Sequence, residues 1–106
     1  MYQNYTFYQN ALNLRLNYLE ALLNMGAVHK DLRHFIEAVA LADQVILINP
    51  LLSEAWSNKG ITLKELKRYD EAIAHYDKAI HLKPDYAESW SNKGVTLQKY
   101  LPAPEI

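Results

Sequence analysis

The stretch Glu54-Ala55-Trp56-Ser57-Asn58-Lys59-Gly60-Ile61-Thr62-Leu63 decides the fold, because it recurs further along the chain as Glu88-Ser89-Trp90-Ser91-Asn92-Lys93-Gly94-Val95-Thr96-Leu97. Eight of the ten positions are identical, and the other two substitutions are conservative. Agreement of this kind indicates an internal repeat with a fixed period, here the offset from position 54 to position 88, which is typical of stacked supersecondary units.

A weaker copy of the same pattern lies at twice this offset, near the beginning of the chain. It aligns the segment that runs up to Gly26 with the segment that runs up to Gly94. Seven residues are kept between the two segments: Tyr8/Tyr76, Ala11/Ala79, Leu14/Leu82, Tyr18/Tyr86, Glu20/Glu88, Asn24/Asn92 and Gly26/Gly94. The same period therefore extends over nearly the whole chain.

Composition narrows the class of protein. The chain has 106 residues, a net charge of −1 and no cysteine. It therefore lacks the positive charge of an electrostatic nucleic-acid binder, and it has no disulfide framework or thiolate zinc site. No apolar run approaches the length of a membrane span, and the first residues do not resemble a signal peptide.

Helix-breaking residues are rare. The chain has only three glycines and four prolines, which favours long helices joined by short turns. Its longest run of β-branched and other large aliphatic residues, 45–48, continues a helical spacing and stops at Asn49-Pro50. We therefore interpret this run as the end of a buried helix rather than as a strand, and we predict an all-α fold.

The repeat resembles the tetratricopeptide repeat (TPR) family, in which two antiparallel helices form each unit. Residues 53–86 carry the family pattern at matching spacings, as Trp56, Gly60, Leu63, Ala72, Tyr76, Ala79 and Pro84. The preceding repeat, 19–52, is more divergent, and Lys59 and Lys93 stand where the family has leucine. The resemblance implies an all-α solenoid of about five or six helices.

We expect one domain, 1–106, with four parts in chain order. These are an orphan second helix (4–17), two full repeats (19–52 and 53–86) and a terminal first helix (87–101). Because Leu16 replaces the closing proline, a single continuous helix over 4–30 is the alternative at this end. At the other end, Pro102 and Pro104 are expected to prevent a further second helix.

The first helix of each repeat also defines a candidate binding face. At 100° per residue, positions 2, 5, 6, 9 and 13 of the repeat share an arc from about 140° to 240°, opposite the packed side. In the family's superhelix this face lines the concave groove, so the resemblance implies that it binds a peptide. The candidate residues are Asn24, Asn58, Asn92, Glu54, Ser57, Ile61, Glu65, Glu88, Ser91 and Val95.

Asparagine occupies position 6 in all three repeats, as Asn24, Asn58 and Asn92. This is similar to the asparagine ladder in the TPR superhelix of the O-linked N-acetylglucosamine transferases. A carboxamide can donate to and accept from one peptide unit of an extended ligand. The alternative is that these asparagines are solvated residues kept by duplication.

Charge on the same face constrains the ligand. Glu20, Glu54 and Glu88 repeat at position 2, while positions 5 and 9 lack the lysine and asparagine of a carboxylate clamp. An acidic tail is therefore disfavoured, and a neutral or basic extended segment fits better.

Catalytic and metal-binding patterns are weak. Neither His29 and His34 nor His75 and His81 have the i, i+4 spacing of a helical metal site. Asp77 and His81 have that spacing, and a surface ion pair is the expected reason. We therefore expect no enzyme activity, no metal, no cofactor, no nucleic-acid partner and no membrane contact.

The resulting hypothesis is a cytoplasmic, non-enzymatic scaffold that binds an extended protein segment. Two alternatives remain: a structural module that self-assembles through its open ends, and a regulatory TPR fragment of a larger enzyme. A homo-oligomer formed through the terminal helices is also expected, because each terminal repeat lacks one helix.

Overall fold

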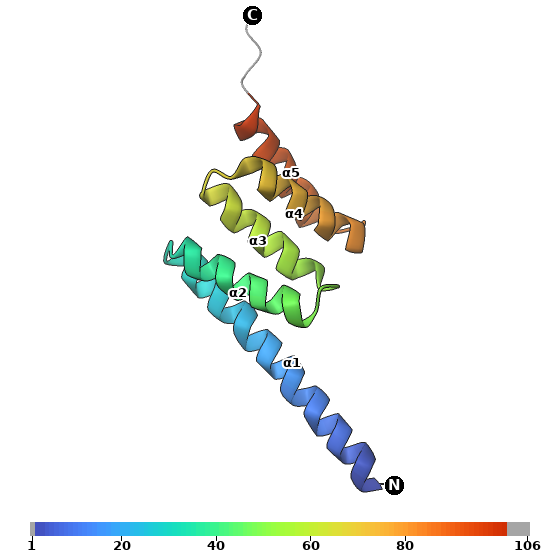
Figure 1. Cartoon of the computed structure of the whole chain (residues 1–106). Helices are drawn as coiled ribbons and strands as arrows, with labels where there is room; N and C mark the ends of the chain where they lie inside the picture. Colours follow the sequence, from blue (N-terminus) through green and yellow to red (C-terminus); the bar gives the residue numbers. More distant parts are fainter. Residues whose placement is uncertain (1, 102–106) are drawn as a thin grey trace, which may run out of the picture.

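The computed structural model describes residues 2–101 and consists of helices joined by short turns. In chain order the helices are α1 (Tyr2–Asp31), α2 (Phe35–Ile48), α3 (Ser53–Glu65), α4 (Tyr69–Leu82) and α5 (Ala87–Tyr100) (Figure 1). Prolines and short polar turns separate them, and no strand occurs within 2–101. The predicted all-α class is confirmed.

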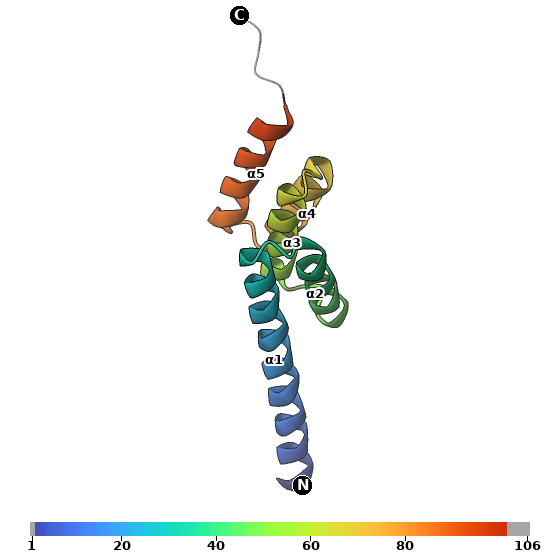
Figure 2. The same cartoon turned by 90° about the vertical axis from the view of Figure 1, so that its left-hand side faces the viewer.

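The helices form two layers. Helices α1, α3 and α5 lie next to one another, and α2 and α4 cover them from the other side (Figure 2). Each consecutive pair packs as a hairpin, and the chain measures 72 × 29 × 17 Å. This elongated shape is that of a helical solenoid, in which each unit contacts only its neighbours.

The hairpin turns within the repeats share an unusual backbone feature. Arg33 and Lys67, which occupy equivalent positions of successive repeats, have positive φ angles of 63° and 62°. The left-handed conformation ends α1 and α3 and lets the chain reverse into α2 and α4. The repeat is therefore preserved in the backbone as well as in the sequence.

Two apolar clusters form the core. Leu19, Leu22, Val45 and Ala55 join α1, α2 and α3, while Leu63, Ala72 and Tyr76 join α3 and α4. Small residues at the buried positions of α2 and α4 allow the helices to approach closely. No unit buries its apolar face alone, and α3 connects the two clusters.

The central repeat contains a very close contact between Gly60 and Tyr76. A Cβ atom added at Gly60 would lie 2.6 Å from Cε1 of the fully buried Tyr76 ring. The absence of a side chain at Gly60 therefore creates the space for the ring. Burial raises the pKa of the Tyr76 phenol, since the phenolate would lose its hydration.

The two tryptophans are less buried than expected from the packed arc. Trp56 is half-buried and Trp90 is 53% exposed. Each indole Nε1–H donates to the carbonyl of the proline that ends the preceding second helix, from Trp56 to Pro50 at 2.8 Å and from Trp90 to Pro84 at 2.9 Å. Tryptophan therefore fixes the junction between repeats, and its ring lies at the edge of the core.

Lysine also has a repeated role where the family has leucine. Lys59 pairs with Asp43, and Lys93 pairs with Asp77, both at 2.7 Å. Each pair connects the second helix of one repeat to the first helix of the next. Asp77 thus pairs with Lys93 and not with His81, so the expected Asp77–His81 pair was wrong.

The N-terminal helix differs from the predicted domain plan. Residues 4–17 do not form a separate second helix, because α1 continues without interruption from Tyr2 to Asp31. Leu16 does not break the helix as a proline would, and Asn13 and Asn17 are insufficient to do so. At 1.5 Å per residue α1 is about 45 Å long, whereas α2 is about 21 Å long. The first half of α1 therefore extends beyond the body of the molecule (Figure 1).

Two further expectations concern a membrane span and the prolines near the end of the chain. No helix within 2–101 is long and apolar enough to cross a membrane. The expected interruption at Pro102 and Pro104 lies outside the described residues.

A buried hydrogen bond joins α3 to α5. The Ser89 hydroxyl donates to the Ser57 hydroxyl oxygen at 2.9 Å, and neither residue is exposed. Because a buried hydroxyl without a partner costs free energy, the two serines are matched to each other.

We expect Gly60→Ala to destabilise the chain. Overpacking costs about 1–3 kcal/mol, and alanine's advantage over glycine in a helix, about 1 kcal/mol, offsets only part of this. Gly26→Ala is the matched control, since its Cβ would lie 3.8 Å from Leu41, an ordinary contact. Urea denaturation measures both variants; a G60A protein as stable as G26A would show that the Tyr76 ring can move aside.

We also expect Ser57→Ala and Ser89→Ala to be non-additive. Each single change leaves one buried hydroxyl unpaired and should cost about 1–3 kcal/mol. The double variant should lose less than the sum of the single losses, because it buries no unpaired hydroxyl. Free energies of unfolding for the four proteins give the coupling; strict additivity would contradict the serine pair.

Candidate functional site

The candidate face runs across the layer formed by α1, α3 and α5. Asn24 lies on α1, Asn58 on α3 and Asn92 on α5, so the packing of these helices arranges the three asparagines in order across the layer. This order follows from the fixed repeat period, which places each asparagine at the same position of its helix.

The predicted residues differ in exposure. Six are exposed, three are half-buried and one is buried. The exposed residues are Asn24, Glu54, Glu65, Glu88, Ser91 and Val95; Asn58, Ile61 and Asn92 are half-buried; and Ser57 is buried.

Ser57 is not available as an open surface contact, because α5 covers it. Its hydroxyl faces Ser89, so position 5 of one first helix packs under position 3 of the next. Leu23, at the same position of α1, is half-buried and packs against the cluster of Leu19, Leu22, Val45 and Ala55. Position 5 therefore lies in the seam between first helices, and Ser91 remains exposed where no further first helix follows within 2–101.

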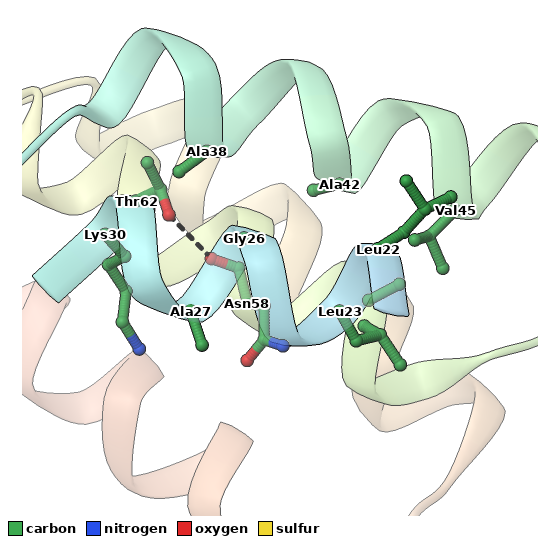
Figure 3. Close-up of a pocket in the computed structure, with 11 residues that line it drawn as sticks. Leu22, Leu23, Gly26, Ala27, Lys30, Ala38, Ala42, Val45, Asn58 and Thr62 are labelled. Carbon is green, nitrogen blue, oxygen red and sulfur yellow. Dashed lines mark hydrogen bonds between the residues drawn. The ribbon is translucent and has the colours of Figure 1, made fainter. Parts of the chain in front are cut away.

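A small apolar cavity lies beside Asn58, between α1, α2 and α3 (Figure 3). Its volume is about 20 Å³, and Leu22, Leu23, Gly26, Ala27, Ala38, Ala42, Val45 and Ala55 line most of it. The Thr62 hydroxyl donates to the backbone carbonyl of Asn58 at 3.0 Å, so this bond does not involve the Asn58 side-chain carboxamide. A space of this size holds about one water molecule, so the cavity is a packing gap rather than a ligand site.

A larger hollow opens at the end of the same face. Its volume is about 330 Å³, and it lies between the end of α1, the turn that follows and α3. Predicted residues Ile61 and Glu65 line one side, and Lys30, Asp31, Arg33 and Phe35 line the other. The lining is therefore mixed: Phe35 and Ile61 are apolar, and the four charged residues are two of each sign.

Arg33 and Phe35 were not predicted as site residues. Arg33 lies in the turn after α1 and Phe35 is the first residue of α2, and the Arg33 guanidinium carbon lies 5.2 Å from the Phe35 ring centroid. A helical projection of the first helices does not include this turn. The counterpart of Phe35 one repeat later is Tyr69, which was the available signal for an aromatic residue here.

The acidic residues at position 2 share a neighbour. The pKa of Tyr86 is raised by burial first and then by the charges of Glu88 and Glu54. Both carboxylates therefore act on one phenol in the turn between α4 and α5.

The Asn92 side chain has an unusual environment. Its Nδ2 atom is buried and has no hydrogen-bond partner within the described residues. An enclosed amide nitrogen without a partner is unfavourable. Reorientation of this carboxamide toward a ligand would therefore sacrifice no hydrogen bond from Nδ2.

His29 and His34 lie close together in the structure, although they do not have the i, i+4 spacing of one helix face. Nδ1 of His29 lies 3.4 Å from Nδ1 of His34, across the turn between α1 and α2. Among residues 2–101, however, no three histidine, aspartate or glutamate side chains gather in a way that could hold a metal ion. The two rings therefore meet across the turn that joins α1 to α2.

Comparison with known proteins gives a consistent fold. The family model described as tetratricopeptide repeat matches residues 53–86. A search of curated proteins returned no match.

Three solved structures of similar fold have TM-scores of 0.72 to 0.73. MamA is 21% identical, over 77% of this chain and 48% of that one. The Sgt2 TPR domain from Aspergillus fumigatus is 20% identical, over 76% and 53%. The first TPR of Spaghetti (RPAP3), bound to the HSP90 peptide SRMEEVD, is 18% identical, over 74% and 64%.

This chain thus spans between about half and two-thirds of the length of these structures. The matched segment 53–86 coincides with α3 and α4 and the turns that flank them. The two repeated glycines, tryptophans and lysine–aspartate pairs place α5 in the same register. Residues 53–86 are therefore a tetratricopeptide repeat, and the chain has the all-α helical-repeat fold of that family.

Proposed function

We propose that this chain is a non-enzymatic, cytoplasmic interaction scaffold that binds an extended peptide along α1, α3 and α5. The observation that carries the proposal is the hollow of about 330 Å³ lined by Ile61 and Glu65. It lies on the same helix as Asn58, whose carboxamide can pair with a peptide unit. Ile61 and Phe35 supply apolar contact for one ligand side chain at this point.

Asn24, Asn58 and Asn92 form the polar row of the proposed groove, similar to the ladder of the O-linked N-acetylglucosamine transferases. Asn24 is exposed, and the other two are half-buried. The unpartnered, buried Nδ2 of Asn92 supports this role, because the carboxamide can turn toward a ligand carbonyl without losing a hydrogen bond from Nδ2. Ser57 is not included, since Ser89 occupies its hydroxyl.

The ligand should be neutral or basic. The charges of Glu54 and Glu88 both raise the pKa of Tyr86, so these two carboxylates supply the negative charge of the face. At the hollow, Lys30 and Arg33 balance Asp31 and Glu65. The peptide bound to the Spaghetti (RPAP3) TPR is acidic, with the sequence SRMEEVD. The charges on this chain's face disfavour such a tail and favour lysine- or arginine-containing segments.

The double variant Asn58→Ala/Asn92→Ala tests the asparagine row. Each hydrogen bond lost should cost on the order of 1 kcal/mol, so peptide Kd should rise roughly 30-fold. Gln44→Ala is the matched control, because it removes an exposed carboxamide from α2, in the other layer. Peptides are first selected from an array of extended segments and then titrated calorimetrically; unchanged affinity in N58A/N92A would remove the asparagines from the groove.

The charge preference is tested with Glu54→Gln/Glu88→Gln. We expect basic peptides to bind roughly 3- to 10-fold more weakly and neutral peptides to bind as before, because exposed charges contribute modestly. Raising the salt concentration should reduce the difference between wild type and variant. A variant that binds basic and neutral peptides with unchanged affinities would show that the acidic row does not select the ligand.

A second role, self-association through the ends of the array, is favoured by the projecting half of α1. Phe7 is 71% exposed, Tyr8 is 72% exposed and Leu14 is 70% exposed. Large apolar side chains gathered on one segment mark an interaction surface.

A further inference from the structure

The face of α5 around Gly94 reproduces a site that is filled elsewhere in the chain. At the equivalent Gly60, the Tyr76 ring occupies the space beside the backbone, and a Cβ would lie 2.6 Å from Cε1. At Gly94 a Cβ would meet no atom within 4 Å, and the residue is exposed. Because the flanking residues are nearly the same, α5 presents the notch that receives Tyr76 in α3, but without an aromatic ring in it.

Trp90 shows the same difference from its equivalent. The Trp56 ring centroid lies 5.6 Å from that of His75, and Nζ of Lys78 lies 5.7 Å from the indole centroid, so α4 covers this indole. Trp90 is 53% exposed, although its Nε1–H is bonded to Pro84 as Trp56 is bonded to Pro50. The indole is thus already oriented, and the contact that a following second helix would provide is missing within 2–101.

The first half of α1 carries the sequence of such a second helix. Phe7, Tyr8 and Ala11 align with His75, Tyr76 and Ala79 of α4, at twice the repeat length. In α4 the tyrosine is fully buried, whereas Tyr8 is 72% exposed. The first half of α1 therefore has the sequence of a second helix, but no first helix within 2–101 packs against its Tyr8.

The molecule's own α5 cannot receive this segment. The projecting half of α1 and helix α5 lie at opposite ends of a body 72 Å long (Figures 1 and 2). Arg15 donates to the Ile48 carbonyl at 2.8 Å, which holds this point of α1 at the end of α2. The α5 that can be reached belongs to a second molecule.

Charge does not oppose the contact. Arg15 is the only charged residue between positions 6 and 18, and its guanidinium already serves the end of α2. Burial of Phe7, Tyr8 and Leu12 would therefore desolvate no unpaired charge.

We propose that the first half of α1 of one molecule packs head to tail on α5 of a second molecule, with Tyr8 in the notch at Gly94. Phe7 then faces Trp90, as His75 faces Trp56 in the central repeat. The contact joins two different surfaces, so a heterologous dimer retains one free α1 and one free α5 and can grow further. This inference rests on the self-association role and is independent of peptide binding.

Sedimentation equilibrium between about 10 μM and 1 mM tests the contact, a range in which exposed apolar surfaces associate. We expect the wild-type mass to rise with concentration above 12.3 kDa. Tyr8→Asp and Gly94→Leu should each remain at 12.3 kDa, because one inserts a charge and the other fills the notch. Leu47→Asp is the control: Leu47 is 86% exposed on α2, so this variant should associate like wild type.

A mixture of the two variants distinguishes the geometry. Y8D keeps an intact α5 and G94L keeps an intact α1, so the 1:1 mixture should form one heterodimer although neither variant associates alone. Circular dichroism should show unchanged helix content, since both sites are exposed. Peptide affinity should also be unchanged, which separates this result from a failure of the proposed groove.

Three results would overturn the inference. A wild-type protein of 12.3 kDa at every concentration would exclude association through this contact. Association of G94L at wild-type strength, with Y8D monomeric, would show that α1 pairs with another α1. A 1:1 mixture that remains monomeric would show that the two sites are not complementary.

Discussion

The packing of the Tyr76 ring against the backbone of Gly60 is the constraint on which the central repeat depends. Because the ring fills the position of a side chain, α3 and α4 approach closely enough to bury Leu63 and Ala72 beside it. The remaining contacts then connect this unit to its neighbours: an indole bonded to a proline carbonyl, a lysine paired with an aspartate, and a serine bonded to a serine. Each of these contacts joins one repeat to the next, as expected for an array in which a repeat contacts only its neighbours.

The fold could be predicted from the sequence because the repeated residues are those that determine the local geometry. Trp56, Gly60 and Tyr76 recur at fixed spacing, and this spacing alone predicts the helix hairpin and its neighbours. The same reasoning did not settle the N-terminal helix. Where Pro50 and Pro84 end α2 and α4, the chain has Leu16, and no local signal determines whether a helix lacking its breaker continues. Tertiary packing decides this, and in the structure nothing forces the chain to turn there.

The candidate site was predicted from the angular positions of residues on a single helix, and this method does not include contacts between helices. The projection of a first helix places Asn58 and Ile61 opposite the packed side, but both are half-buried, and Ile61 packs against the cluster of Leu63, Ala72 and Tyr76. The projection misses this because it treats the neighbouring helices as absent. Position 5 lies at the edge of the arc, and the following first helix covers it, as it does at Ser57. The ion pairs Lys59–Asp43 and Lys93–Asp77 could have been predicted from the sequence, because both members of the first pair recur one repeat later. The hollow beside Arg33 and Phe35 was not predictable in this way, because it depends on a turn.

The two proposed interactions use different sides of α5. At about 100° per residue, Asn92 lies roughly 200° around the helix from both Trp90 and Gly94. The side that would receive a neighbouring α1 is therefore nearly opposite the side that would face a peptide. Self-association would leave the asparagine row open in every molecule, and each added copy would add another row. A short array with one weak peptide site would in this way present several sites at once, and linked sites bind a repeated ligand more tightly than one site does.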